Sequence, residues 1–133
     1  MQRRQKNLLG YNIDLFNVEE ALDYSNSLID SAKSSHIVTI NPEIIEYANK
    51  HENFAKILKE AELVIPDGIG IKIGLKINGE NVQRITGIGF AHSLLENAQK
   101  NNIPVALVGA KPHVIEKAYE NFKQEMPELN VVY

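Results

Sequence analysis

The sequence predicts an α/β fold: a Rossmann-like, mostly parallel sheet with helices on both faces, preceded by a short N-terminal β-hairpin. From residue 36 onward, short apolar runs alternate with amphipathic stretches at helical spacing. Many of these segments begin or end at Gly, Pro or Asn, which interrupt regular structure. Consecutive crossovers of this kind give parallel strands covered on both faces. The 133 residues contain no repeat or linker, so we expect one domain over residues 1–133.

The N-terminal part is predicted to form a hairpin and then a helix. Residues 8–16 have the pattern of a short strand or hairpin, with a turn near Gly10 and Asn12. Asn17 is a favourable helix N-cap, and Glu20, three residues later, completes a capping box. Apolar residues at helical spacing follow, so this helix has one inner face.

The middle of the chain is predicted to contain a strand, two helices and a second strand. Residues 36–40 are rich in β-branched side chains and indicate a strand. Asn41 caps the next helix, and Pro42 suits its first position. Apolar residues within 54–61 recur at helical spacing and predict the second helix. Residues 63–65 form a short apolar run that predicts a buried strand.

A turn signal at residues 66–68 ends that strand, and the remaining segments continue the alternation. Residues 82–86 fit neither a helix nor a strand pattern clearly. We expect three further helices, at 70–77, from Gly87 to the Asn101-Asn102 pair and from Pro112 to Pro127, and two strands, at 104–108 and 129–133.

Composition excludes several functional classes. Hydrophobic residues make up 44% of the chain and cysteine is absent, which excludes disulfides, thiolate nucleophiles and cysteine–zinc sites. A net charge of −3 argues against nucleic acid as a partner. No apolar stretch approaches the ~18 residues of a membrane span, so we expect a cytoplasmic protein. We interpret the basic run of Arg3, Arg4 and Lys6 as a frayed, solvated terminus.

The segment Pro66-Asp67-Gly68-Ile69-Gly70 is the strongest candidate for chemistry. A carboxylate between a buried strand and a helix can face a cleft and accept a proton from a substrate hydroxyl. Gly68 and Gly70 let a ligand approach the backbone, and the helix N-terminus behind them favours phosphate. The structural alternative is an Asp-Gly turn in which Asp67 caps the following helix. The next glycine, Gly74, comes one position too late for the Gly-x-Gly-x-x-Gly fingerprint, which argues against a dinucleotide site.

Three further segments contain candidate ligand contacts, each with a structural alternative. Thr39 and Asn41 lie at a strand-to-helix junction and can hydrogen-bond a sugar or phosphate, although capping alone explains Asn41. Arg84 can offset the charge of a leaving diphosphate or lie on a solvated surface. Gly109 and Lys111 form a glycine turn into a helix that suits an anion or ribose, or an ordinary tight connection.

Nothing in the sequence predicts a metal or a cofactor. None of the four histidines pairs with another at metal-ligand spacing on one predicted helix face. The Asp-x-Asp pair that many sugar-nucleotide enzymes use to hold a divalent metal is absent. The chain contains neither a nucleophile elbow nor a Walker loop.

Taken together, these junctions resemble the WecG/TagA/CpsF family of bacterial glycosyltransferases. The Pro-Asp-Gly-x-Gly motif in this order and spacing carries most of the resemblance, which spans the chain from about Gly10. The matching stretches are residues 39–44, 61–70, 84–87, 108–112 and 126–132.

The resemblance implies an inverting, metal-independent transferase without a cofactor. Its donor would be a UDP-N-acetylhexosamine, often UDP-N-acetylmannosamine, and its acceptor a polyprenyl-diphosphate-linked sugar. The products would feed teichoic acid, common antigen, capsule or exopolysaccharide. By position, Asp67 matches the general base, Thr39 and Asn41 match pocket residues, and Arg84 matches a basic pocket residue. The predicted substrate-binding set is Thr39, Asn41, Gly68, Gly70, Arg84, Gly87, Gly109 and Lys111.

The sequence departs from the family in two ways. Gly89 replaces the Asp that usually follows the Thr-Gly motif by two residues, and the chain ends near the middle of the family's length. The other half normally carries a basic C-terminal segment, through which we expect peripheral contact with the membrane-bound acceptor. The alternative function is a catalytically inactive nucleotide-binding or partner-binding fragment. An incomplete sheet would leave an edge that favours a homo-oligomer.

Overall fold

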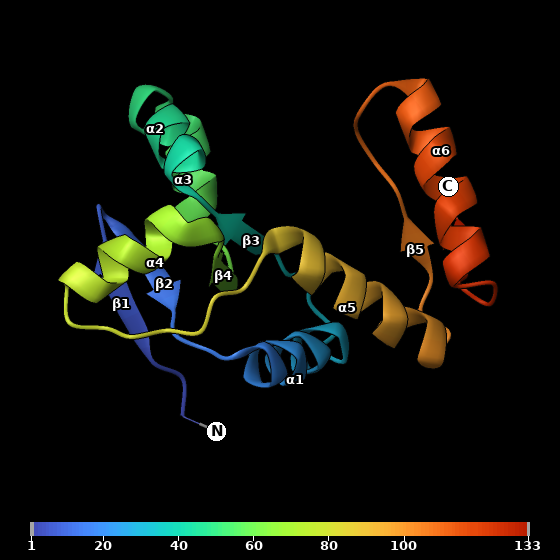
Figure 1. Cartoon of the computed structure of the whole chain (residues 1–133), viewed down its shortest axis with the longest axis horizontal. Coiled ribbons are helices and arrows are strands. Elements are labelled where there is room, and N and C mark those ends of the chain that lie inside the picture. Colours follow the sequence, from blue (N-terminus) through green and yellow to red (C-terminus); the bar gives the residue numbers. More distant parts are fainter. Residues whose placement is uncertain (1, 133) are drawn as a thin grey trace. The chain divides into compact units, whose positions relative to one another are not determined.

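The computed structural model describes residues 2–132, which contain helices and short strands in alternation (Figure 1). The chain divides into two compact units, Met1–Phe90 and Ala91–Tyr133. The first unit holds β1 (Gln5–Leu8), β2 (Tyr11–Asp14), α1 (Val18–Ile29), β3 (Ile37–Ile40), α2 (Pro42–Lys50), α3 (Glu52–Lys59), β4 (Leu63–Pro66) and α4 (Gly68–Ile77). After α5 (Gly87–Lys100), which begins in the first unit, the second holds β5 (Val105–Ala106), α6 (Pro112–Glu125) and β6 (Val131–Val132).

The strands pair in three two-stranded sheets within the described residues. Strands β1 and β2 form an antiparallel hairpin, whereas β3 pairs with β4 and β5 with β6 in parallel. The predicted α/β class, N-terminal hairpin and parallel pairing are therefore confirmed. Segment 82–86, which fitted no pattern, contributes only one parallel bridge, between Asp67 and Ile85.

The hairpin turn falls at Leu9 and Gly10, where the sequence predicted it. Both residues have positive φ, 53° for Leu9 and 94° for Gly10, which is the backbone geometry of a two-residue hairpin turn. The hairpin starts earlier than expected, at Gln5, because the polar residues of β1 pair with β2 despite their weak apolar pattern.

The basic run of Arg3, Arg4 and Lys6 is not a frayed terminus, and that interpretation is wrong. Lys6 lies in β1, and the Arg4 carbonyl accepts from the Leu15 backbone N–H at 2.9 Å.

Arg3 is hydrogen-bonded to Asp14. Its Nε and Nη2 donate to the two carboxylate oxygens of Asp14 at 2.7 and 3.1 Å. Nη2 also donates to the carbonyl oxygen of Glu62 at 2.7 Å. Asp14 is fully buried and accepts a third hydrogen bond, from the Val64 backbone N–H at 2.8 Å. The hydrogen bond to Asp14 raises the pKa of Arg3, so this guanidinium stays charged.

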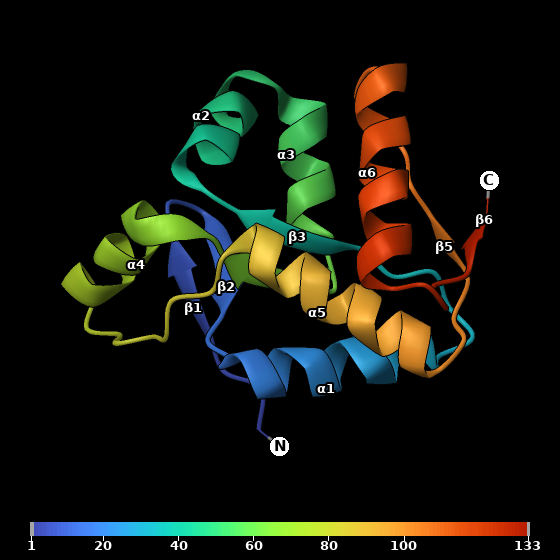
Figure 2. The ribbon, with the colours of Figure 1, turned by 45° about the vertical axis from the view of Figure 1, so that its right-hand side comes forward.

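The predicted caps position the first two helices. The Asn17 side chain accepts from the Glu20 backbone N–H, and Glu20 accepts from the Asn17 backbone N–H, both at 2.9 Å. This reciprocal pair confirms the capping box of α1. At α2, Asn41 is the N-cap and Pro42 occupies the first turn, as predicted. Figure 2 shows α2 and α3 as neighbouring helices after β3.

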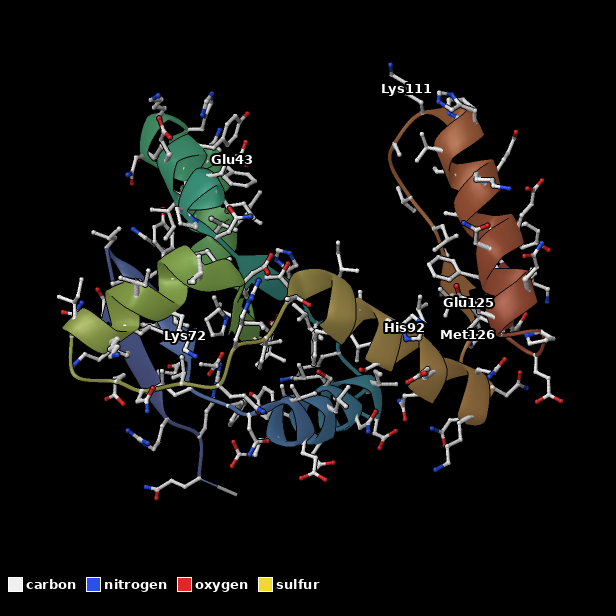
Figure 3. All side chains as sticks on the ribbon, viewed as in Figure 1. Glu43, Lys72, His92, Lys111, Glu125 and Met126 are labelled. Atoms are coloured by element: carbon white, nitrogen blue, oxygen red, sulfur yellow. The ribbon has the colours of Figure 1, made fainter. Side chains whose placement is uncertain are left out.

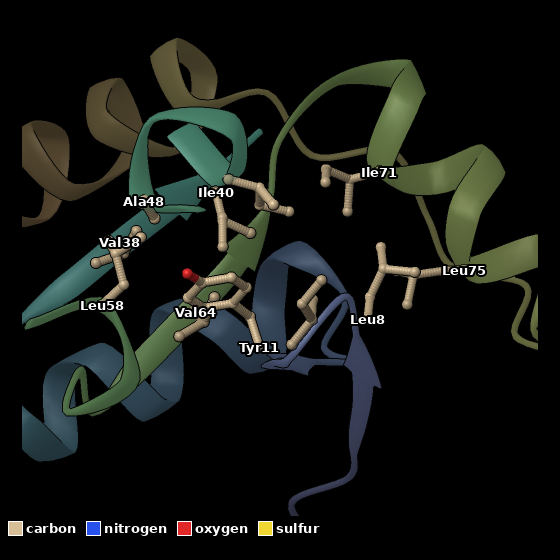
Figure 4. Packing of buried hydrophobic residues seen from close by; sticks show 11 residues of the cluster. Leu8, Tyr11, Val38, Ile40, Ala48, Leu58, Val64, Ile71 and Leu75 are labelled. Atoms are coloured by element: carbon tan, nitrogen blue, oxygen red, sulfur yellow. The ribbon is translucent and has the colours of Figure 1, made fainter. Parts of the chain in front are cut away.

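The core of the first unit lies between the hairpin, the β3–β4 pair and helices α2 to α4. Figure 4 shows Ile71 and Leu75 of α4 facing Leu8 of the hairpin. Gly74 allows this approach, since a Cβ there would lie 3.1 Å from Leu8 Cδ2. Helix α4 is thereby fixed by one face against β1, which also fixes the direction in which it leaves Asp67.

The second unit has its own small core of Ala98, Met126 and Leu129. His92 lies 3.3 Å from Glu125, so α5 and α6 also meet through a polar contact (Figure 3). Strand β5 covers only two of the five residues predicted as a strand at 104–108. Of the strand predicted at 129–133, Val131–Val132 form β6, and Tyr133 lies outside the described residues.

Candidate functional site

The candidate site is built on the carboxyl ends of β3 and β4. Their parallel register pairs Thr39 with Ile65 and Ile40 with Pro66. The Asp67 backbone N–H then donates to the Ile40 carbonyl at 2.8 Å, which continues the ladder past the end of β4. Because the strands run in the same direction, Thr39, Asn41 and Asp67 reach the same edge, which is where ligands bind in parallel α/β sheets.

Asp67 uses its carboxylate to hold the start of a different helix. It occupies the N-cap position of α4, but its side chain makes no capping hydrogen bond there. Instead, Oδ1 accepts from the backbone N–H of Gly87, the first residue of α5, at 2.9 Å. Asp67 therefore has the N-cap position that the structural alternative predicted, but its side chain bonds to the start of α5 and not to α4. The half-buried carboxylate lies at the N-terminus of α5.

Gly87 is the point where Thr39 and Asp67 come together. A Cβ placed on Gly87 would lie 2.9 Å from Thr39 Oγ1 and 3.0 Å from Asp67 Oδ2. A third close contact, 3.2 Å, would be with Thr39 Cβ. The Thr39 hydroxyl and the second carboxylate oxygen of Asp67 thus border one small space beside the Gly87 backbone. The sequence predicted Gly87 as a substrate contact; the hydrogen bond from its N–H to Asp67 was not predicted.

We expect Gly87→Ala to lower the free energy of unfolding by about 1–3 kcal/mol, since the added methyl group has to displace Thr39 or Asp67. The measurement is urea unfolding of the purified chain. Ile88→Ala is the matched control at the next position, because the Ile88 side chain is 88% exposed; it should change stability by less than about 0.5 kcal/mol. Equal stabilities for the two variants would show that the space beside Gly87 is not tight.

The oxygen and the nitrogen of the Asn41 side-chain amide have different surroundings. Its Oδ1 accepts from the Ile44 backbone N–H at 2.8 Å, so the capping explanation holds for the oxygen. The amide Nδ2 is the end of this half-buried side chain that remains for a ligand.

Gly68 and Gly70, the two glycines after Asp67, are required for different structural reasons. Gly68 has a φ of +80°, a conformation that side-chain-bearing residues rarely adopt, so the sharp entry into α4 requires glycine. A Cβ on Gly70 would lie 2.7 Å from Pro42 Cγ, so Gly70 lets α4 pack against the start of α2. This packing keeps the N-termini of α2 and α4 together at the strand ends.

For the remaining predicted contacts, Arg84, Gly109 and Lys111, the structure gives no hydrogen bond to Asp67 or Thr39 among the described interactions. Arg84 is exposed and precedes Ile85, the residue that bridges to Asp67. Gly109, with φ +106°, and Lys111, the N-cap of α6, are exposed and belong to the second unit (Figure 3). Their membership of the site around Asp67 stays a prediction. Among residues 2–132, no three His, Asp or Glu side chains gather as a group that could hold a metal ion.

Gly89, which stands where the family usually has Asp, makes a contact that the sequence did not predict. The backbone N–H of Gly89 donates to Thr86 Oγ1 at 3.1 Å, which caps α5. A Cβ on Gly89 would lie 2.8 Å from the same hydroxyl. Glycine at position 89 therefore leaves room for the Thr86 hydroxyl, which caps α5, the helix whose first N–H binds Asp67.

The fold is that of an α/β protein, and the carboxylate beside two helix-opening glycines lies at the strand ends, the edge at which parallel α/β sheets bind ligands. The sequence matches the Glycosyl transferase WecG/TagA/CpsF family over residues 6–133. The chain belongs to this family.

Two curated relatives carry the same name, N-acetylglucosaminyldiphosphoundecaprenol N-acetyl-beta-D-mannosaminyltransferase. The protein from Bacillus spizizenii is 35% identical over 104 residues, which are 77% of this chain and 40% of that protein. The protein from Staphylococcus aureus strain NCTC 8325 is 31% identical over 104 residues, 77% of this chain and 41% of that protein. The matched part of this chain thus spans about 40% of these relatives' length. No helix in residues 2–132 is long and apolar enough to cross a membrane.

Proposed function

We propose that this protein acts as an inverting, metal-independent glycosyltransferase with Asp67 as its general base. It transfers an N-acetylhexosamine of the N-acetylmannosamine type from a UDP-sugar to a polyprenyl-diphosphate-linked sugar at the cytoplasmic face of the membrane. The product enters teichoic acid or another cell-surface polysaccharide. Family membership and the names of the relatives support the sugar and the acceptor. The observation that carries the proposal is the Asp67 carboxylate, held by Gly87 beside Thr39 at the strand ends.

The reaction needs a base because a sugar hydroxyl is a weak nucleophile at neutral pH. The acceptor hydroxyl attacks the anomeric carbon of the donor, the bond to the UDP oxygen breaks, and the hydroxyl proton passes to Asp67. Oδ1 already accepts the Gly87 N–H, so Oδ2 is the oxygen that takes the proton. Positioned general-base catalysis of this kind contributes about 10²–10⁴-fold to the rate.

The leaving UDP gathers negative charge that the protein has to stabilise. The N-terminus of α4 begins at Gly68, beside the base, and its backbone N–H groups are not capped by the Asp67 side chain. Arg84, near the bridge between Asp67 and Ile85, supplies a full positive charge. The Thr39 hydroxyl and the Asn41 amide nitrogen suit the hydroxyl and acetamido groups of the sugar.

Transfer by the complete gene product tests the proposal. The assay supplies UDP-N-acetylmannosamine and a short-chain polyprenyl-diphosphate-N-acetylglucosamine and measures the disaccharide product by mass spectrometry. Because protein groups alone stabilise the leaving group in this mechanism, excess EDTA should leave the rate within about twofold. A rate that falls with EDTA and returns with Mg²⁺ or Mn²⁺ would contradict the metal-independent mechanism. Absence of product with every UDP-N-acetylhexosamine would contradict the enzymatic function itself.

Gly89 is the observation that favours the second candidate, a fragment that binds the nucleotide without transfer. The family usually carries a carboxylate at this position, and here no side chain replaces it. Calorimetric titration with UDP distinguishes the two candidates. Binding of UDP without any turnover in the transfer assay would favour the non-catalytic function.

A further inference from the structure

Helix α5 begins with a turn that contains two glycines, beside the ends of β3 and β4 (Figure 1). Gly87 and Gly89 are the first and third residues of the helix. Glycine is a poor helix former because it loses more backbone freedom on folding than any other residue. The turn also contains no acidic side chain, the type that stabilises a helix N-terminus. Its own composition therefore gives this turn little stability.

Two side chains from different parts of the chain cap this turn. Thr86 precedes the helix, and its Oγ1 accepts from the Gly89 backbone N–H at 3.1 Å. The Thr86 carbonyl accepts from the Phe90 N–H at 2.9 Å, so Thr86 is the N-cap residue of α5. The Gly87 N–H donates to Asp67 Oδ1 at 2.9 Å. The candidate base and Thr86 thus bind two N–H groups of the same turn.

The geometry couples these two caps. The Gly87 N–H can orient the Asp67 carboxylate only while the backbone at Gly87 keeps its helical conformation. Thr86 is covalently bonded to Gly87, and its hydroxyl closes the turn through Gly89. The direction of the Gly87 N–H therefore depends on the Thr86 cap. Gly89 also stands where the family usually has Asp, so this chain has no carboxylate in the turn that could compensate for loss of the hydroxyl.

We propose that Thr86 is a positioning residue for the candidate base. Its hydroxyl closes the first turn of α5 and thereby holds the Gly87 N–H against Asp67 Oδ1. Oδ2, which borders the space beside Thr39, is then left to take the proton. In this role Thr86 acts through Gly87 and needs no contact with donor or acceptor. The inference rests on the proposed function, because the carboxylate that Thr86 orients is the base of the proposed transfer.

Buried residues on both sides of the turn allow the hydroxyl to be removed from a folded protein. Ile85 and Phe90 are each 2% exposed, and Ile85 forms a parallel bridge with Asp67. These contacts should keep the turn attached to the fold when its cap is lost. Thr86→Val removes the hydroxyl and keeps the branched shape of the side chain, so we expect the turn to open more often without global unfolding.

Hydrogen exchange of the Gly87 amide tests the proposal without donor, acceptor or turnover. It is measured by nuclear magnetic resonance on the complete gene product with isotope-labelled glycine. Thr86→Val should raise the Gly87 exchange rate roughly 5-fold or more, because the rate follows the population of the open turn and loss of an N-cap typically shifts such an equilibrium by this factor. Thr86→Ser keeps the hydroxyl and should exchange like the wild type. An unchanged Gly87 rate in Thr86→Val would overturn the proposal.

Sugar transfer by the complete gene product is the second measurement. Thr86→Val should lower kcat roughly 5- to 10-fold and change KM for donor and acceptor by less than about twofold, since a displaced base slows the chemical step and not substrate binding. Thr86→Ser should keep the wild-type kcat. The matched control is Asn17→Ala, which removes the N-cap of α1 and should also keep it. Equal losses of kcat in Thr86→Val and Asn17→Ala would assign the effect to general stability and refute the positioning role.

A double variant separates positioning from direct contact with the substrate. In an Asp67→Asn background no base is left to position, so adding Thr86→Val should lower the residual kcat by less than about twofold. A further loss as large as in the wild-type background would mean that Thr86 acts independently of Asp67, and the proposal would fail. If the wild type transfers no sugar, the proposed function fails, and the exchange rate of Gly87 alone decides whether Thr86 orients Asp67.

Discussion

Asp67→Asn is expected to lower kcat for sugar transfer by about 10²–10⁴-fold, because the amide cannot take the proton of the attacking hydroxyl. The substitution is close to isosteric, and the Asn side-chain oxygen can still accept the Gly87 N–H that Asp67 Oδ1 accepts at 2.9 Å. The site geometry should therefore survive, and KM for the donor should change by less than about threefold. The measurement is steady-state transfer by the complete gene product.

Asp23→Asn is the control for this prediction, since Asp23 is exposed on α1 and the substitution removes the same charge. Its kcat should equal that of the wild type. The melting temperatures of both variants should stay close to the wild-type value, so that a loss of rate reports on chemistry. An Asp67→Asn enzyme with wild-type turnover would remove this carboxylate from the mechanism, and the family membership would stand unaffected.

Local signals in the sequence predicted the frame of the site well. Asn41 and Pro42 mark the start of α2, and Pro66 and Gly68 flank the turn at Asp67. Each of these residues affects only the backbone next to it, so its effect can be predicted from the sequence alone. The parallel crossover then fixes the strand ends at one edge. For this reason the placement of Thr39, Asn41 and Asp67 at one edge was predictable from two short segments, 39–42 and 66–68.

Contacts between distant segments were not predictable in the same way. Asp67 and Gly87 are 20 residues apart, and nothing local to Gly87 reveals that its N–H holds a carboxylate. Arg3 and Asp14 are 11 residues apart, and a basic N-terminal run looks like solvated chain until a buried partner is known. The sequence pattern also does not distinguish the exposed isoleucines of α4 from its buried ones, because both faces of that helix are apolar.

Asp14→Ala is expected to lower the free energy of unfolding by about 3 kcal/mol, the lower end of the range for breaking a buried ion pair. The loss leaves the Val64 N–H without its buried acceptor and Arg3 without its carboxylate partner. The lower end applies because the Arg3 side chain is 36% exposed and water stabilises the released guanidinium. Urea unfolding of the purified chain measures the effect.

Glu46→Ala is the matched control, since it removes a carboxylate from an exposed ion pair with Lys50 on α2. Exposed pairs of this kind contribute about 0.5 kcal/mol or less, so the two variants should differ several-fold. Asp14→Asn should fall between them, because its amide oxygen can still accept the Val64 N–H. If Asp14→Ala were as mild as Glu46→Ala, the Arg3–Asp14 pair would not hold the N-terminal segment to the fold.

The same substitution connects stability with the site. Val64 lies in the middle of β4, three residues before Asp67, and Asp14 fixes its backbone from the neighbouring strand β2. Weakening this anchor should loosen the end of β4 and with it the position of the Asp67 carboxylate. In conditions where Asp14→Ala remains folded, we therefore expect kcat to fall while the equally charged Glu46→Ala variant keeps it. A carboxylate buried on one side of β4 would then stabilise the strand that presents a second carboxylate to the substrate.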